Sequence, residues 1–224
     1  TLRVEAYGQN SFRVRARASG PILDTAYALL PAAQQEGTVT LGETESRIEN
    51  GKIVAVIQDE SGWDDAAGHY VSRSRLRIEN ADGKVLLEEI SRGGSLKYQP
   101  REFSPLVGGD HAVRQSFVGQ LGEKFYGMGM YQQDQFNLRG STLELAHRNS
   151  QASVPFVLSD RGYGFLWHNP AIGEVTFASN RTQWSGESSK QIDYWVTAES
   201  DPKLISRNYA QATGSAPVMP EYGL

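Results

Sequence analysis

The sequence predicts an all-β fold, a large antiparallel β-sandwich with one short helix near the C-terminus. Residues 1–8 and 11–18 alternate apolar and polar side chains, the period expected of half-buried strands. Asn-Gly at 50–51 and Asp-Gly at 82–83 each lie between two strand-like segments and are typical of β-hairpin turns. Helical periodicity is clear only over residues 201–214.

The first ninety residues are predicted to form three hairpins. Residues 1–18 turn at Gln9-Asn10, residues 45–60 turn at Asn50-Gly51, and residues 75–89 turn at Asp82-Gly83. In the first hairpin the alternation directs six side chains inward: Leu2, Val4, Ala6, Phe12, Val14 and Ala16. Successive hairpins of this kind favour antiparallel sheets.

The second half continues the strand pattern. Residues 154–158 and 163–168 read as strands joined by a turn at 159–162, and Pro170 ends the second because it cannot donate to a sheet. Residues 173–179 and 191–199 are two further candidate strands.

The helix prediction rests on its two ends. Asp201 is a suitable N-cap, Pro202 suits the first helical position, and Gly214 is a natural stop. Leu204, Ile205 and Tyr209 would share one face, and an extended connector would follow. We therefore expect a β-sandwich over residues 1–200, and a helix and linker over residues 201–224.

Composition excludes several classes of function. The net charge of −4 and the lack of a Lys/Arg cluster argue against nucleic acid, and no apolar run reaches the ~20 residues that span a membrane. Cysteine is absent, which excludes disulfides and fits a reducing compartment such as the cytoplasm. The four histidines have no metal-ligand spacing. We expect no metal and no cofactor.

An amide-rich stretch is the best candidate for a ligand contact. Gly127 and Gly129 alternate with methionines, which suggests a strand approached closely by another backbone. Tyr131, Gln132, Gln133 and Asp134 follow, and amides suit sugar hydroxyls because they both donate and accept hydrogen bonds. The alternative is a solvent-exposed hairpin tip.

Asp64-Asp65 is a poor catalytic pair because adjacent side chains of an extended chain point to opposite sides, and Trp63 beside it would anchor that loop.

Three motifs together resemble the N-terminal region of glycoside hydrolase family 31. They are Tyr126-Gly127-Met128-Gly129, Val154-Pro155-Phe156 and Gly162-Tyr163-Gly164, and the resemblance extends over residues ~120–224. Many members carry a charged or aromatic residue after the second glycine, whereas this chain has Met130-Tyr131-Gln132. The loop that shapes the sugar pocket therefore departs from the usual pattern.

The resemblance implies a galactose-mutarotase-like sandwich that precedes a (β/α)8 barrel. The parent would be a retaining, exo-acting α-xylosidase or α-glucosidase with its catalytic aspartates on the barrel, so we expect no catalytic residue in this chain. Tyr131, Gln132, Gln133 and Asp134 would wall the sugar pocket. The implied partners are an α-linked oligosaccharide or glycoside and the barrel, and an oligomer is left open. The chain starts directly in a strand pattern and stops as a new segment begins, so we expect it to be part of a longer protein.

Two other functions remain open at this point. A free-standing carbohydrate-binding module would present aromatic side chains in a line, with Trp63, Trp167, Trp184 and Trp195 as candidates, although Trp167 and Trp195 lie in apolar strand patterns. A sugar epimerase would need a histidine and a carboxylate at the anomeric centre, and His147 with Glu144 is the nearest pair.

Overall fold

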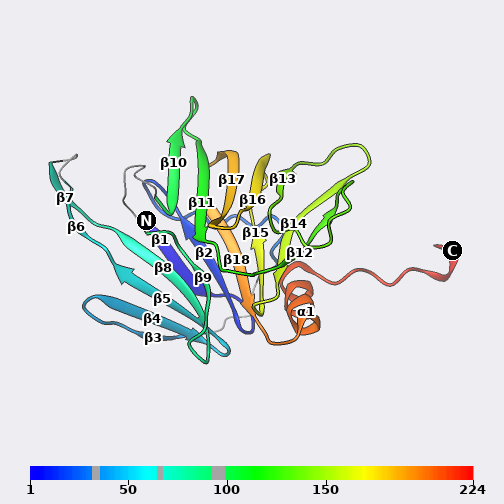
Figure 1. Ribbon diagram of the computed structural model, residues 1–224, viewed down its shortest axis with the longest axis horizontal. Helices are drawn as coiled ribbons and strands as arrows, with labels where there is room; N and C mark the ends of the chain where they lie inside the picture. Colours follow the sequence, from blue (N-terminus) through cyan, green and yellow to red (C-terminus); the bar gives the residue numbers. More distant parts are fainter. Residues whose placement is uncertain (32–35, 65–67, 92–98, 224) are drawn as a thin grey trace.

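The computed structural model describes residues 1–31, 36–64, 68–91 and 99–223 and is dominated by antiparallel strands (Figure 1). The large sheet has six strands in the order β1-β2-β18-β15-β14-β12. These are β1 (Leu2–Ala6), β2 (Ser11–Ala16), β18 (Ile192–Ala198), β15 (Tyr163–Trp167), β14 (Ala152–Ser159) and β12 (Phe125–Met130). The all-β prediction is confirmed.

Two five-stranded sheets and a small hairpin complete the strands. The second sheet contains β10 (Arg101–Pro105), β11 (His111–Val118), β17 (Arg181–Ser189), β16 (Gly173–Phe177) and β13 (Thr142–Leu145). The third sheet contains β3 (Thr38–Thr40), β4 (Glu45–Asn50), β5 (Ile53–Asp59), β8 (Ser74–Asn80) and β9 (Val85–Glu88). The hairpin pairs β6 (Gly62–Asp64) with β7 (His69–Val71).

The core lies between the sheets. Phe165 of the large sheet packs its ring 5.7 Å from that of Phe117 and 4.9 Å from that of Trp184, both on the second sheet. The predicted inward set is confirmed: Phe12, Val14 and Ala16 are buried, and Leu2, Val4 and Ala6 pack partly buried against the same core. The three predicted hairpins form as β1–β2, β4–β5 and β8–β9.

The outer face of the large sheet is also covered. Helix α1 (Pro202–Thr213) buries Ile205 there beside Trp195, and Tyr209 stacks on Phe156 with ring centroids 4.0 Å apart. The predicted caps are both present, since Asp201 accepts from the Lys203 N–H at 2.9 Å and Gly214 donates to the Ala210 carbonyl at 2.8 Å.

Two local expectations were wrong. Trp63 is not buried as an anchor within the described residues, because it is 65% exposed on β6. The C-terminal connector is not extended throughout, since η1 (Glu221–Gly223) forms a 3-10 turn in which Gly223 donates to the Pro220 carbonyl. No helix within the described residues has the length and apolar character to cross a membrane.

Candidate functional site

The candidate loop, residues 131–141, leaves the edge of the large sheet through an irregular strand. The β12–β14 register shifts between Gly127 and Gly129, and Met128 sits at φ 71° with its side chain buried. A Cβ on Gly129 would lie 2.2 Å from the Ala152 carbonyl oxygen. The predicted close backbone approach is therefore confirmed, and it explains why glycine occupies this position.

Tyr131 ties the start of the loop to the two neighbouring strands. Its hydroxyl is hydrogen-bonded to the Glu144 carbonyl oxygen at 2.8 Å and to Ser153 Oγ at 2.7 Å. Burial raises the pKa of the Tyr131 hydroxyl, and the hydrogen bond to Ser153 offsets part of that effect. Of the four residues predicted to bind substrate, Tyr131 is thus the one whose polar group is already engaged within the chain.

Gln132, Gln133 and Asp134 differ from Tyr131 in that all three are exposed. Within the described residues their side chains form no hydrogen bond or ion pair, although the Gln133 N–H donates to the Tyr131 carbonyl at 3.0 Å. Their donors and acceptors are therefore available to a ligand or to a neighbouring domain. That they contact substrate stays a prediction.

A hollow of about 540 Å³ lies beside the start of this loop. We call it the hollow; it is lined by Tyr27, Ala28, residues 145–147, 153–155 and 166–172, and Tyr209. Ser153 belongs to its wall and also bonds Tyr131, so the hollow and the loop are contiguous. In Figure 1, β12, β14 and α1 occupy one side of the molecule, from which the C-terminal segment extends.

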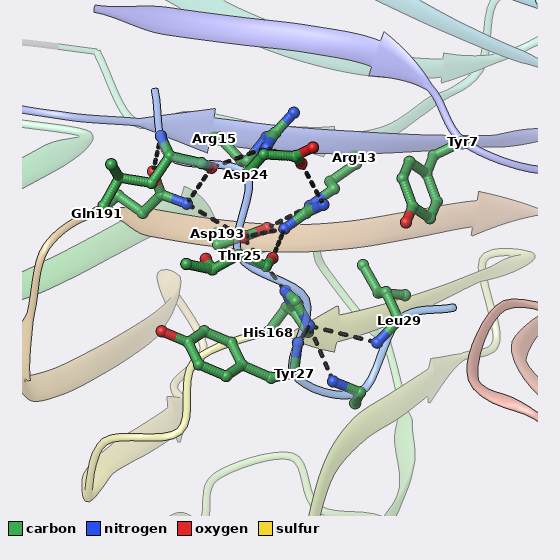
Figure 2. Close-up of polar contacts among 12 residues, drawn as sticks. Tyr7, Arg13, Arg15, Asp24, Thr25, Tyr27, Leu29, His168, Gln191 and Asp193 are labelled. Carbon is green, nitrogen blue, oxygen red and sulfur yellow. Dashed lines mark hydrogen bonds and ion pairs between the residues drawn. The ribbon is translucent and has the colours of Figure 1, made fainter. Parts of the chain in front are cut away.

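One wall of the hollow belongs to a strap, residues 23–30, which crosses the outer face of the large sheet without helix or strand. Buried side chains hold its backbone (Figure 2). Gln191 accepts from the Leu23 N–H at 3.0 Å and donates to the Leu23 carbonyl at 3.1 Å, while Arg13 donates to the Thr25 carbonyl. The sequence analysis did not identify this network. The signal that could have indicated it is the position of Arg13 and Arg15, which alternate with apolar residues along strand β2.

A buried ion pair between strands β2 and β18 lies under the strap and holds Arg13 in place to bind it. Arg13 of β2 and Asp193 of β18 are both about 2% exposed, and two hydrogen bonds of 3.0 and 2.7 Å join them. Burial by itself lowers the pKa of Arg13, but the hydrogen bond and charge of Asp193 outweigh it, so the pKa is raised. Arg15 adds bonds to Asp24 and to the Leu23 carbonyl.

The other carboxylates considered from the sequence are engaged. Asp64 pairs with Arg73, whereas Asp65 lies outside the described residues. Glu144 pairs with Arg148, which holds the pKa of Glu144 below its usual value. Among the described residues, no three His, Asp or Glu side chains gather to hold a metal ion.

The tryptophans do not form a sugar-stacking platform. Trp167, Trp184 and Trp195 are each 1% exposed, and Trp63 is the exposed member of the four. This arrangement weighs against a free-standing carbohydrate-binding module, which needs several accessible rings.

Comparison with known proteins shows that the chain is similar to part of several carbohydrate-active enzymes. Residues 1–175 match the glycosyl hydrolase 31 N-terminal galactose mutarotase-like domain. An uncharacterized family 31 glucosidase of Pseudescherichia vulneris is 40% identical over 99% of this chain and 42% of its own length. α-Xylosidase A of Aspergillus niger is 27% identical over the whole chain and 32% of its own length.

A solved structure agrees with these relatives. The crystal structure of a family 31 α-xylosidase from a soil metagenome, complexed with xylose, superposes with a TM-score of 0.88 and 42% identity. The match covers 99% of this chain and 33% of that one, so the chain spans a third of this structure and about two fifths of the Pseudescherichia vulneris relative. The chain therefore belongs to glycoside hydrolase family 31, in which residues 1–175 correspond to the N-terminal galactose mutarotase-like domain.

Proposed function

We propose that this chain is the N-terminal segment of a retaining, exo-acting α-glycosidase, an α-xylosidase or an α-glucosidase. The observation that carries the proposal is its likeness, over nearly its whole length, to an α-xylosidase that is about three times as long and was solved with xylose. The catalytic carboxylates belong to a C-terminal (β/α)8 barrel, where double displacement proceeds through a covalent glycosyl intermediate.

The chain contributes one wall of the sugar pocket. Tyr131 holds the base of the loop, and Gln132, Gln133 and Asp134 position sugar hydroxyls or fence the pocket. Their exposure and lack of partners within the described chain support this role. The barrel docks on the side that carries the hollow, and residues 201–224 form the helix and linker between the sandwich of residues 1–200 and that barrel.

The test is a kinetic comparison in the intact enzyme. Gln132→Ala/Gln133→Ala is expected to lower kcat/KM on an aryl α-xyloside or an aryl α-glucoside by about a hundredfold, because misplacing a substrate by 1 Å costs that much. Gln120→Ala, in the β11–β12 connection, is the matched control and should retain the wild-type rate.

Two outcomes separate the parts of the proposal. An unchanged kcat/KM in the double variant on every α-glycoside would remove the loop from the site. A wild-type enzyme inactive on all α-glycosides would refute the assigned activity itself. Proton NMR of the first product distinguishes the mechanism, since a retaining enzyme releases the α-anomer before mutarotation.

A further inference from the structure

His168 holds the strap in an unusual way. Its side chain is 1% exposed, and Nε2 accepts from three consecutive backbone N–H groups, those of Tyr27, Ala28 and Leu29, at 3.2, 3.1 and 3.4 Å (Figure 2). A ring nitrogen accepts a hydrogen bond only while it carries no proton. The strap therefore closes on a neutral imidazole with its proton on Nδ1.

The opposite edge of the ring faces charge. Nδ1 lies 3.2 Å from Asp193 Oδ2, but it makes no hydrogen bond within the described residues. Arg13 takes both oxygens of that carboxylate. The further groups on the surrounding elements are Glu5 of β1, Arg15 of β2, and Asp24 and Tyr27 of the strap, while His147 and Tyr209 line the adjoining hollow.

These charges do not oppose protonation of the ring, because three carboxylates surround two guanidinium groups. What opposes it is the strap, since a proton on Nε2 would face three N–H donors at hydrogen-bond distance. The ring can gain a proton only if the strap gives up all three bonds. Histidine is the side chain whose ordinary charge change falls between pH 5 and 8.

We propose that His168 is a proton-sensitive latch: the neutral ring holds residues 27–29 on the large sheet, and a proton taken up from solvent at Nε2 releases them. Tyr27 and Ala28 line the hollow, so release removes one of its walls. The next residue of the strap, Leu30, donates from its N–H to the Ala212 carbonyl of α1 at 2.8 Å, so the opening reaches the helix.

Hydrogen exchange of the intact protein tests the latch. After correction for the intrinsic pH dependence of exchange, protection at residues 27–29 should fall at least tenfold between pH 8 and pH 5.5. Amides of β15 should keep their protection over the same range. His168→Gln offers one carbonyl acceptor that cannot be protonated, so its strap should be less protected and insensitive to pH. His111→Gln, on β11, should retain the wild-type response.

Three results would overturn the proposal. The first is wild-type protection at residues 27–29 that does not change with pH. The second is an equal pH response in His168→Gln. The third is a loss of exchange protection that extends equally to the amides of β15, which would indicate global acid unfolding. The wild-type measurement decides even if His168→Gln fails to fold.

Discussion

Replacing Gly129 by alanine tests whether the entry to the candidate loop depends on a backbone contact that no side chain can share. The residue has φ 91°, and an added Cβ would meet the Ala152 carbonyl oxygen at 2.2 Å and the Val154 nitrogen at 2.9 Å. Both neighbours are backbone atoms of β14, so a rotamer change cannot relieve the contact. Strand β12 must move away from β14.

The expected destabilisation has two parts. A non-glycine residue at this φ costs about 1–3 kcal/mol. Separating the strands weakens roughly two neighbouring ladder hydrogen bonds, each worth about 1 kcal/mol. The sum, about 3–5 kcal/mol, is a large part of the roughly 5–15 kcal/mol that stabilises a typical domain.

A second glycine of the same loop provides a control for the cost of placing a non-glycine residue at positive φ. Gly140 lies at the other end of the loop with φ 89°, and an added Cβ there would meet nothing within 4 Å. Gly140→Ala should therefore carry the backbone cost alone, about 1–3 kcal/mol. Urea unfolding followed by the fluorescence of the buried tryptophans measures both variants. Equal losses in the two variants would show that the β12–β14 contact contributes nothing and would refute the reasoning.

Two further predictions concern buried charge. Glu123, hydrogen-bonded to Ser159 and Tyr163, has its pKa raised from the ordinary 4.5 by burial, against the effect of those hydrogen bonds. The contribution of Glu123 to stability is present below its unfolded pKa and is lost as pH rises through its folded pKa. The free energy of unfolding should therefore fall as pH rises from about 4.5, and it should fall less steeply in Glu123→Gln. Identical slopes of unfolding free energy against pH in the two proteins, measured by urea unfolding, would contradict this. Asp193→Ala leaves the buried Arg13 without its carboxylate and should cost about 3–5 kcal/mol. Arg13→Met/Asp193→Leu should lose less unfolding free energy than Asp193→Ala when both are measured by urea unfolding. A double variant less stable than the single one would count against the cost of an uncompensated charge.

Much of the fold could be predicted because its signals are local. Alternation in β2, the Asn50-Gly51 turn and the Asp201 cap each act within a few residues, and each has the predicted structure. Strands β11 and β17 were not predicted. Polar or small residues interrupt their apolar alternation, as Gln115 does between Val113 and Phe117, so they become recognisable only when the large sheet covers them.

The candidate site also has one part that could be predicted from the sequence and one part that could not. The amide-rich residues 132–134 were identifiable because they follow a glycine-rich strand, and the structure leaves them exposed. The hollow and its strap could not be identified from the sequence. Their residues, Tyr27, residues 145–147 and His168, are far apart in sequence and form one surface only after the sheets assemble.

The sequence by itself determined an all-β chain, its hairpin turns, its capped helix and a polar loop, because period, turn chemistry and capping depend on neighbours along the chain. Only the tertiary structure decided which charges are buried and what they hold. Arg13, His168 and Asp193 look like solvated or strand-end residues in the sequence, and their partners become defined when three strands and the strap meet at one face. The reason is physical: a buried polar group is stable only with a partner in place, and packing chooses that partner.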